Sequence, residues 1–173
     1  MPIYALGDVA PTIDPTAFVH PDAVLIGDVR IGPEASIWPG AVLRGDGGGY
    51  VEVGAQTSIQ DNSVLHTVPG TPTVVGARCL VGHIVHLEAC TLHDGSMVGN
   101  AAMVLHRSVV GTGAIVAANS VVLYDVEIPP GALAVGSPAV IKPGRASPEM
   151  IEQGVESYLE RARTYPTTLR RIG

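Results

Sequence analysis

Small apolar residues recur at every sixth position through most of this chain. The first run is Val19, Leu25, Ile31, Ile37 and Leu43. The later runs are Val53, Ile59 and Leu65; Val75, Val81 and Leu87; and Leu92, Val98, Val104, Val110, Val116 and Val122. A fixed short period is typical of repeat architectures, and a period of six predicts a parallel β-helix of triangular coils. Three rungs make one coil, so residues one coil apart stack at the strand spacing of ~4.8 Å.

The repeat is interrupted in three places. Two insertions of four residues, around 45–50 and 68–72, break the spacing, and the step from Leu87 to Leu92 is shortened to five. Both insertions contain glycine, which favours loops at the corners of the prism. The pattern therefore predicts a β-helix over residues 17–140.

The two ends of the chain lie outside this pattern. Residues 1–16 are expected to form an extended lead-in. Residues 147–165 are predicted to form a helix, with Ser147 as N-cap and Pro148 at the first helical position. Its apolar face, at helical spacing, comprises Met150, Ile151, Val155, Tyr158, Leu159 and Ala162. We expect this face to pack along one side of the prism.

Composition supports one all-β domain over residues 1–173. Apolar residues make up 46% of the chain but aromatic residues only 4%, which suits a narrow interior of aliphatic side chains. The net charge of −6 argues against nucleic acid or an anionic membrane as a partner. No apolar run approaches the ~20 residues of a membrane span, and the sequence carries no recognisable secretory signal. We expect a cytoplasmic protein in which Cys79 and Cys90 are reduced.

Polar residues at one recurring position predict a ladder on an outer face. Side chains alternate along a strand, so the residue after each repeat residue points out of the prism. Arg44, His66 and Glu88 hold this position and follow one another at intervals of one coil. Asp61 and His83 stack in the same way on a neighbouring face. We therefore expect His66 and Glu88 within coordinating distance, with His83 of the same chain pointing elsewhere.

A threefold assembly could complete a metal site from these two ladders. In a trimer, His83 of one chain would face the His66–Glu88 pair of its neighbour. Two imidazoles and a carboxylate suit a divalent transition metal with one position left for water. Arg44 and Asp46 are either an exposed ion pair of little energetic weight or a desolvated pair beside the subunit interface.

The other outward histidines have a simpler interpretation. The chain has six histidines, and a single outward-facing histidine is usually a surface residue. We assign His20, His93 and His106 to this class, because none has a companion on either ladder.

Several short motifs resemble the gamma-class carbonic anhydrases and their relatives. They are Arg44-Gly45-Asp46, then Gln60-Asp61-Asn62 followed by His66, and then Gly82-His83. The segment 136–139 and the C-terminal helix fit the same family. The resemblance covers nearly the whole chain, and it is the combination that is specific, since many acyltransferases share the hexapeptide repeat.

The resemblance implies a left-handed β-helix, a homotrimer and a metal at each subunit interface. The usual metal is Zn²⁺, and Fe²⁺ or Co²⁺ can substitute. By this resemblance His66 and His83 are ligands. Gln60 and Asp61 would orient the metal-bound water and neighbouring groups, and the pair formed by Arg44 and Asp46 would support the trimer contact.

The chain departs from the family pattern at position 88. The third ligand of the family is a histidine five residues after the one that matches His83, and here that residue is Glu88. Three outcomes are open: Glu88 ligates the metal, His86 ligates in its place, or the site binds metal weakly or not at all. A carboxylate ligand would acidify the bound water less than an imidazole, which predicts lower turnover at neutral pH.

The leading functional hypothesis is a metal-dependent lyase, a carbonate dehydratase. In this hypothesis metal-bound hydroxide attacks CO2 to give bicarbonate at the trimer interface, with Gln60 bonded to the hydroxide. One alternative is acyl transfer, as in other hexapeptide-repeat proteins, with His66 or His83 as the base. A second alternative, favoured by the missing histidine, is a non-catalytic trimeric binder of metal or a small molecule.

Overall fold

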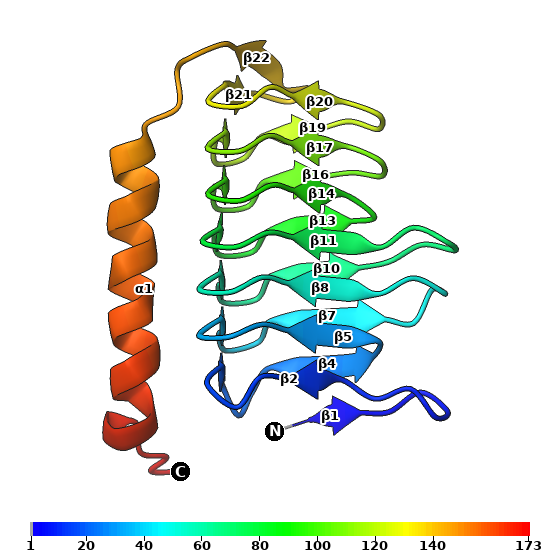
Figure 1. Ribbon diagram of the computed structural model, residues 1–173, viewed down its shortest axis with the longest axis vertical. Helices are drawn as coiled ribbons and strands as arrows, with labels where there is room; N and C mark the ends of the chain where they lie inside the picture. The colour runs from blue at the N-terminus through cyan, green and yellow to red at the C-terminus, as the bar shows by residue number, and fades with distance from the viewer. Residues whose placement is uncertain (1) are drawn as a thin grey trace.

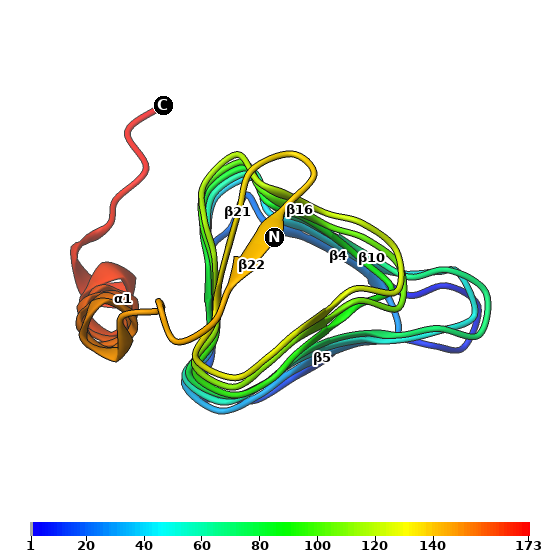
Figure 2. The ribbon, with the colours of Figure 1, turned by 90° about the horizontal axis from the view of Figure 1, so that it is seen from above.

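The chain forms a triangular prism of stacked coils with one helix along a side (Figures 1 and 2). The computed structural model describes residues 2–173. Three parallel sheets form the sides of the prism, and successive strands along the chain belong to successive sheets. The left-handed parallel β-helix with a C-terminal helix, predicted from the six-residue repeat and the family resemblance, is confirmed.

One side, which we call the ladder sheet, carries the predicted ladder. Its strands are β1 (Ile3–Tyr4), β4 (Val24–Gly27), β7 (Val42–Gly45), β10 (Val64–His66), β13 (His86–Glu88), β16 (Met103–Val104) and β19 (Val121–Val122).

A second side, the open sheet, has no helix against it. Its strands are β2 (Thr12–Ile13), β5 (Val29–Ile31), β8 (Val51–Val53), β11 (Thr73–Val75), β14 (Thr91–Leu92), β17 (Val109–Val110) and β20 (Glu127–Ile128).

The third side, the helix-covered sheet, ends in an antiparallel strand. Its strands are β3 (Phe18–Val19), β6 (Ser36–Ile37), β9 (Ser58–Ile59), β12 (Leu80–Val81), β15 (Met97–Val98), β18 (Ile115–Val116), β21 (Leu133–Val135) and β22 (Val140–Lys142). Of these, only β22 runs against its neighbour, β21.

The repeat residues fill the interior in vertical stacks. On the ladder sheet Leu43, Leu65 and Leu87 pair in register and are fully buried. The pairing spans the two insertions because each extra segment leaves the prism at the same corner, where the loops project in Figure 2. The predicted corner loops are therefore present. The short step from Leu87 to Leu92 likewise keeps Leu92 in register with Val75.

The first coil begins earlier than expected. Part of the expected lead-in over residues 1–16 forms β1, which pairs with β4, and β2, which pairs with β5. Between them Leu6 and Val9 bridge a further projecting loop. Ile13 in β2 lies six residues before Val19, so the repeat extends back to this strand. β1 lies outside the spacing because the projecting loop separates it from β2.

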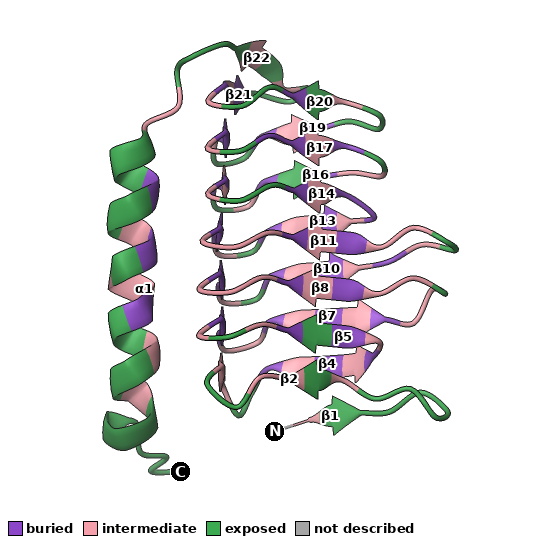
Figure 3. Ribbon diagram, viewed as in Figure 1, coloured by how far each residue is buried: buried purple, intermediate pink, exposed green. Residues whose placement is uncertain are grey.

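The C-terminal helix α1 (Pro148–Thr168) packs against the helix-covered sheet. Ser147 caps it by accepting a hydrogen bond from the Met150 amide. Three of its apolar residues are buried, as Figure 3 shows on the face turned to the prism: Ile151, Val155 and Leu159. Met150, expected on this face, is 55% exposed. It lies in the first turn, one position round the helix from Ile151.

The helix also ends later than expected. It continues through Pro166, and the Leu169 amide still bonds to the Tyr165 carbonyl. Ion pairs fix it along the prism: Arg78 contacts Glu152 and Glu156, and Arg163 contacts Glu34. None of the described helices is long and apolar enough to cross a membrane.

The outer face of the ladder sheet carries a mainly aliphatic stack beside the polar ladder, and no other element of the single chain covers it. Its outward residues stack in register, and one such stack is Val24, Val42, Val64, His86, Met103 and Val121. The equivalent stack on the open sheet includes Arg30, Glu52, Thr91 and Glu127. Met103 is exposed and the valines of this stack are partly exposed. A row of apolar side chains open to solvent is typical of a surface that another protein covers.

Candidate metal centre

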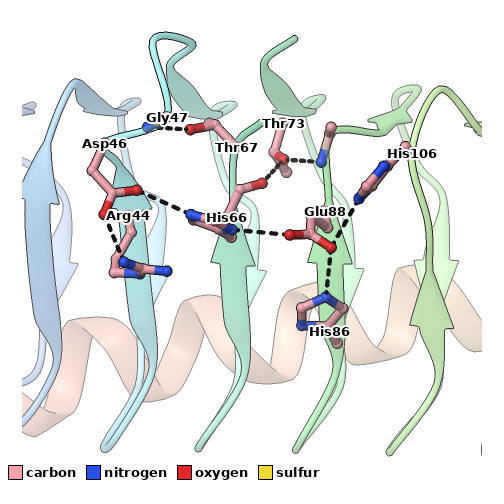
Figure 4. A network of polar contacts seen from close by, with 10 residues as sticks. Arg44, Asp46, Gly47, His66, Thr67, Thr73, His86, Glu88 and His106 are labelled. Carbon is pink, nitrogen blue, oxygen red and sulfur yellow. Dashed lines mark hydrogen bonds and ion pairs between the residues drawn. The ribbon is translucent and has the colours of Figure 1, made fainter. Parts of the chain in front are cut away.

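The predicted ladder of Arg44, His66 and Glu88 lies on the ladder sheet. Register pairing places His66 opposite Arg44 on one side and opposite Glu88 on the other. The imidazole of His66 lies between two carboxylates: Nδ1 is 3.0 Å from Oε1 of Glu88, and Nε2 is 3.0 Å from Oδ1 of Asp46. Figure 4 shows this row of contacts across the strands.

Two threonine hydroxyls hold the C-terminal end of the His66 strand. The Thr73 hydroxyl donates to the His66 carbonyl and accepts from the Ala89 amide, so it joins the ends of β10 and β13. The Thr67 hydroxyl accepts from the Gly47 amide, which ties the loop after Asp46 to the same coil (Figure 4). The loop insertions therefore position Asp46 against the ladder.

Arg44 and Asp46 pair with each other within one chain. Nη1 of Arg44 is 2.6 Å from Oδ2 of Asp46, whose other oxygen faces His66. The contact orients the Asp46 carboxylate towards the imidazole. Their predicted place beside a subunit interface stays a prediction.

Glu88 is surrounded by histidines. Besides His66, the ring of His106 places Nε2 2.9 Å from Oε2 of Glu88, and Nε2 of His86 lies 3.5 Å from the same oxygen. The hydrogen bond from His106, followed by that from His66, lowers the pKa of Glu88 to about 2. Glu88 is therefore a carboxylate at neutral pH, which is the form that binds metal.

His83 lies apart from this cluster, as expected, and stacks on Asp61. Its Nδ1 is 2.9 Å from Oδ2 of Asp61. A carboxylate that accepts from Nδ1–H leaves the lone pair of the imidazole on Nε2, which is the usual arrangement behind a metal-ligating histidine. Nε2 is 3.5 Å from the hydroxyl of Tyr158 on α1. Burial, and then the charge of Asp61, raises the pKa of Tyr158.

Gln60 directly follows β9 and is almost buried, with 6% of its surface exposed. Among residues 2–173 its side-chain amide has no hydrogen-bond partner, while its backbone pairs with Val81 and Ser63. The amide is thus available to a ligand or to a neighbouring chain.

The donor chemistry of the cluster fits a cation. Both ring nitrogens of His66 face carboxylate oxygens, which only accept, so the two contacts need two protons, or one proton and a metal ion. Asp46 and Glu88 carry two negative charges, and Arg44 supplies one fixed positive charge. Within the described part of the chain, however, no group of three His, Cys, Asp or Glu side chains is placed to hold a metal. One chain supplies a fitting but incomplete donor set.

His106 is the residue that the sequence analysis missed. It was assigned to the ordinary surface histidines, but its ring lies against Glu88. Counting coils would not have found it. Leu87 pairs with Val104, so His106 lies one residue beyond the position in register with Glu88 and sits in a corner turn. His20, in contrast, lies outside this cluster: its Nδ1 accepts from the Asp22 amide of its own turn, and its ring packs near Phe18.

Comparison with known proteins shows the family of the chain. The family described as bacterial transferase hexapeptide (six repeats) matches residues 10–45. Gamma carbonic anhydrase 1, mitochondrial, of Arabidopsis thaliana is 42% identical over 138 residues, which are 76% of this chain and 50% of that protein. Carnitine operon protein CaiE of Escherichia coli is 40% identical over 139 residues, which are 80% of this chain and 70% of that protein.

A solved structure extends the similarity over both whole chains. It is a hexapeptide transferase family protein from Anaplasma phagocytophilum, with a TM-score of 0.89 and 38% identity over 95% of this chain and 98% of that one. The chain belongs to the hexapeptide-repeat family that includes the gamma carbonic anhydrases. It spans about half the length of the plant relative. The family resemblance is thereby confirmed, and the ligand role of Glu88 stays a prediction.

Proposed function

We propose that this chain is a gamma-carbonic-anhydrase-like metalloprotein that hydrates carbon dioxide at the subunit interfaces of a homotrimer. The proposal rests on one observation: two incomplete parts of a metal site lie apart from each other within one chain. His66 and Glu88 lie on an uncovered sheet, and His83, oriented by Asp61, lies at a neighbouring corner without reaching them. A second copy of the chain would bring the halves together.

The aliphatic stack on the outer face of the ladder sheet supports the assembly. Val42, Val64 and Met103 stack beside the ladder with no cover from α1, which occupies a different side of the prism (Figure 2). Full burial of an aliphatic side chain contributes ~1.5–3 kcal/mol, so several such residues favour association strongly. Closed cyclic symmetry would repeat the same contact at each interface.

Each residue of the proposed site has a defined task. His66 and Glu88 of one chain and His83 of its neighbour would hold the metal, with Zn²⁺ as the first candidate and Fe²⁺ or Co²⁺ as substitutes. Bound zinc would supply a nucleophile by lowering the pKa of a water towards neutrality. Asp46 and Asp61 orient the two imidazoles, and Gln60 offers its amide to the substrate. The released proton would pass to solvent buffer.

The experiment loads purified protein with Zn²⁺, Co²⁺ or Fe²⁺ under reducing, anaerobic conditions and measures metal content, oligomeric state and bicarbonate formation. We expect one metal per chain and a rate above buffer alone. His83→Ala and His66→Ala should each lose metal and activity. Loaded protein that shows no rate with any of the metals would reject the catalytic proposal in favour of the non-catalytic binder.

A mixing experiment tests whether the site is shared between chains. His83→Ala and His66→Ala chains are unfolded together in equal amounts and refolded into mixed trimers. About a quarter of the interfaces should then combine an intact His66 with an intact His83 from the neighbour. Activity should return to about that fraction of the wild-type value. Mixed trimers as inactive as either variant would show that the two histidines do not share a site.

Acyl transfer is the second candidate, favoured by the solved transferase-family relative. That activity would require coenzyme A to bind in a groove between subunits. Titration of the trimer with coenzyme A distinguishes the two functions, since saturable binding weakened by His66→Ala would favour transfer. The cytoplasmic location stays a prediction.

A further inference from the structure

Glu88 contacts two further histidines besides His66, the residue proposed to bind the metal with it. Oε1 faces His66, while Oε2 is held by His106 at 2.9 Å and approached by His86 at 3.5 Å. The carboxylate is mostly shielded, with 23% of its side chain exposed. The two oxygens therefore have different environments, and Figure 4 shows His106 on the side away from His66.

His106 is itself fixed by the coil above Glu88. Its ring packs edge to face on Tyr124, with centroids 5.1 Å apart. Its carbonyl accepts from the Asp125 amide, and the neighbouring Arg107 forms a two-pronged ion pair with Asp125. The Tyr124 contact supports the ring, and the other two contacts fix the turn that carries it.

We propose that His106 is a positioning residue that fixes the Glu88 carboxylate so that Oε1 alone is offered as a metal ligand. His106 Nε2–H donates to Oε2 and leaves Oε1 on the side of His66. The inference rests on the proposed function, and it identifies how a carboxylate serves where the resemblance implies a histidine.

The physical reason lies in the flexibility of glutamate. An imidazole has two side-chain torsions and offers its nitrogen at a fixed place on a rigid ring. A glutamate has a third torsion, whose preferences are broad, and two equivalent oxygens. A ligating carboxylate is normally held by an outer hydrogen bond, and loss of such a partner typically costs about 10–100-fold in metal affinity. His106 is the best-placed partner for this task, because His86 lies farther from the same oxygen.

The test measures Co²⁺ in the full-length assembled protein. Affinity is obtained by competition with a chelator, and the visible absorption of bound Co²⁺ reports its donor set and geometry. His106→Ala should weaken binding by about 10–100-fold and change the spectrum. His106→Gln, which keeps a donor for Oε2, should restore most of the affinity and the spectrum. His93→Ala, an exposed histidine outside the cluster, is the matched control and should behave as wild type.

The outcomes separate this inference from the proposed function. Wild-type protein that binds no cobalt rejects both. Wild-type protein that binds cobalt, with His106→Ala unchanged in affinity and spectrum, rejects the positioning role alone. Thermal unfolding of each metal-free variant shows whether a loss reflects misfolding. A crystal structure of metal-free His106→Ala gives a second readout: Glu88 turned away from His66 supports the role, and an unmoved carboxylate contradicts it.

Discussion

Nδ1 of His83 lies 2.9 Å from Oδ2 of Asp61, one coil below it on the prism. The contact holds the imidazole with Nε2 directed away from its own strand. Both side chains are partly exposed, at 42% and 37%, so the pair adds little to folding stability. The contact with Asp61 instead orients the His83 ring.

Asp61→Asn should therefore weaken zinc binding without destabilising the fold. We expect a loss of about 10–100-fold in affinity, because the amide holds the ring less firmly than the carboxylate. Chelator competition measures the affinity, and thermal unfolding of the metal-free protein checks stability. Asp8→Asn, at an exposed residue outside both ladders, is the control. Equal zinc affinity in the two variants would show that Asp61 does not orient the His83 ring for metal binding.

The uncovered face of the ladder sheet should control oligomerisation. Val64 and Val74 are both outward-facing valines of central strands, Val64 on the ladder sheet and Val74 on the open sheet. Val64→Asp should convert the proposed trimer to monomers, because it buries a charge in the proposed interface. Val74→Asp should remain trimeric. Light scattering after size-exclusion chromatography measures both masses, and a trimeric Val64→Asp protein would place the interface elsewhere.

Cys90 should be inert in the folded protein. It is 1% exposed, and burial raises the pKa of its thiol to about 12. In the unfolded chain the thiol ionises near pH ~8.5, so the unfolded state loses this proton first as pH rises. Stability should therefore fall above pH ~8.5, by up to ~1.4 kcal/mol per pH unit for this group.

Two measurements check the behaviour of this thiol. A thiol reagent at pH 8 should modify Cys90 only after unfolding. Denaturant unfolding at pH 8 and pH 10 should show a smaller loss of stability for Cys90→Ala than for wild type. Rapid labelling of the native protein at Cys90 would show that the interior opens locally.

The interior stack should be sensitive to truncation. Leu65 is fully buried between Leu43 and Leu87 in the middle of the prism. Leu65→Ala should lower the free energy of unfolding by about 2–5 kcal/mol, because a rigid stack cannot collapse into the cavity. Leu6→Ala, at a residue 52% exposed, should change it by no more than about 0.5 kcal/mol. Denaturant titration compares the two, and similar losses would contradict the stacked core.

The sequence predicted those parts of the candidate site whose position follows from the six-residue repeat. Counting rungs across the insertions placed Arg44, His66 and Glu88 in one row, and the strands pair in that register. The environment of Glu88 was not predictable in the same way. His106 lies in a corner turn, where the direction of a side chain depends on local backbone torsions rather than on strand alternation.

The two ends of the chain show the same difference between local signals and long-range pairing. The helical period and the cap at Ser147 predicted α1, because these signals are local. The strands before residue 17 were missed. Ile13 in β2 lies six residues before Val19 and continues the repeat, whereas β1 is separated from β2 by the loop that Leu6 and Val9 bridge.

By itself the sequence determined the coil, the stacking register and the two ladders, since a six-residue period fixes which side chains face inward and which lie one coil apart. Only the tertiary structure decided that the Glu88 carboxylate is held by His106 and that the aliphatic stack beside the ladder remains uncovered. Both depend on distances between side chains from different coils and on where α1 packs, and these are properties of the folded chain that no local pattern encodes.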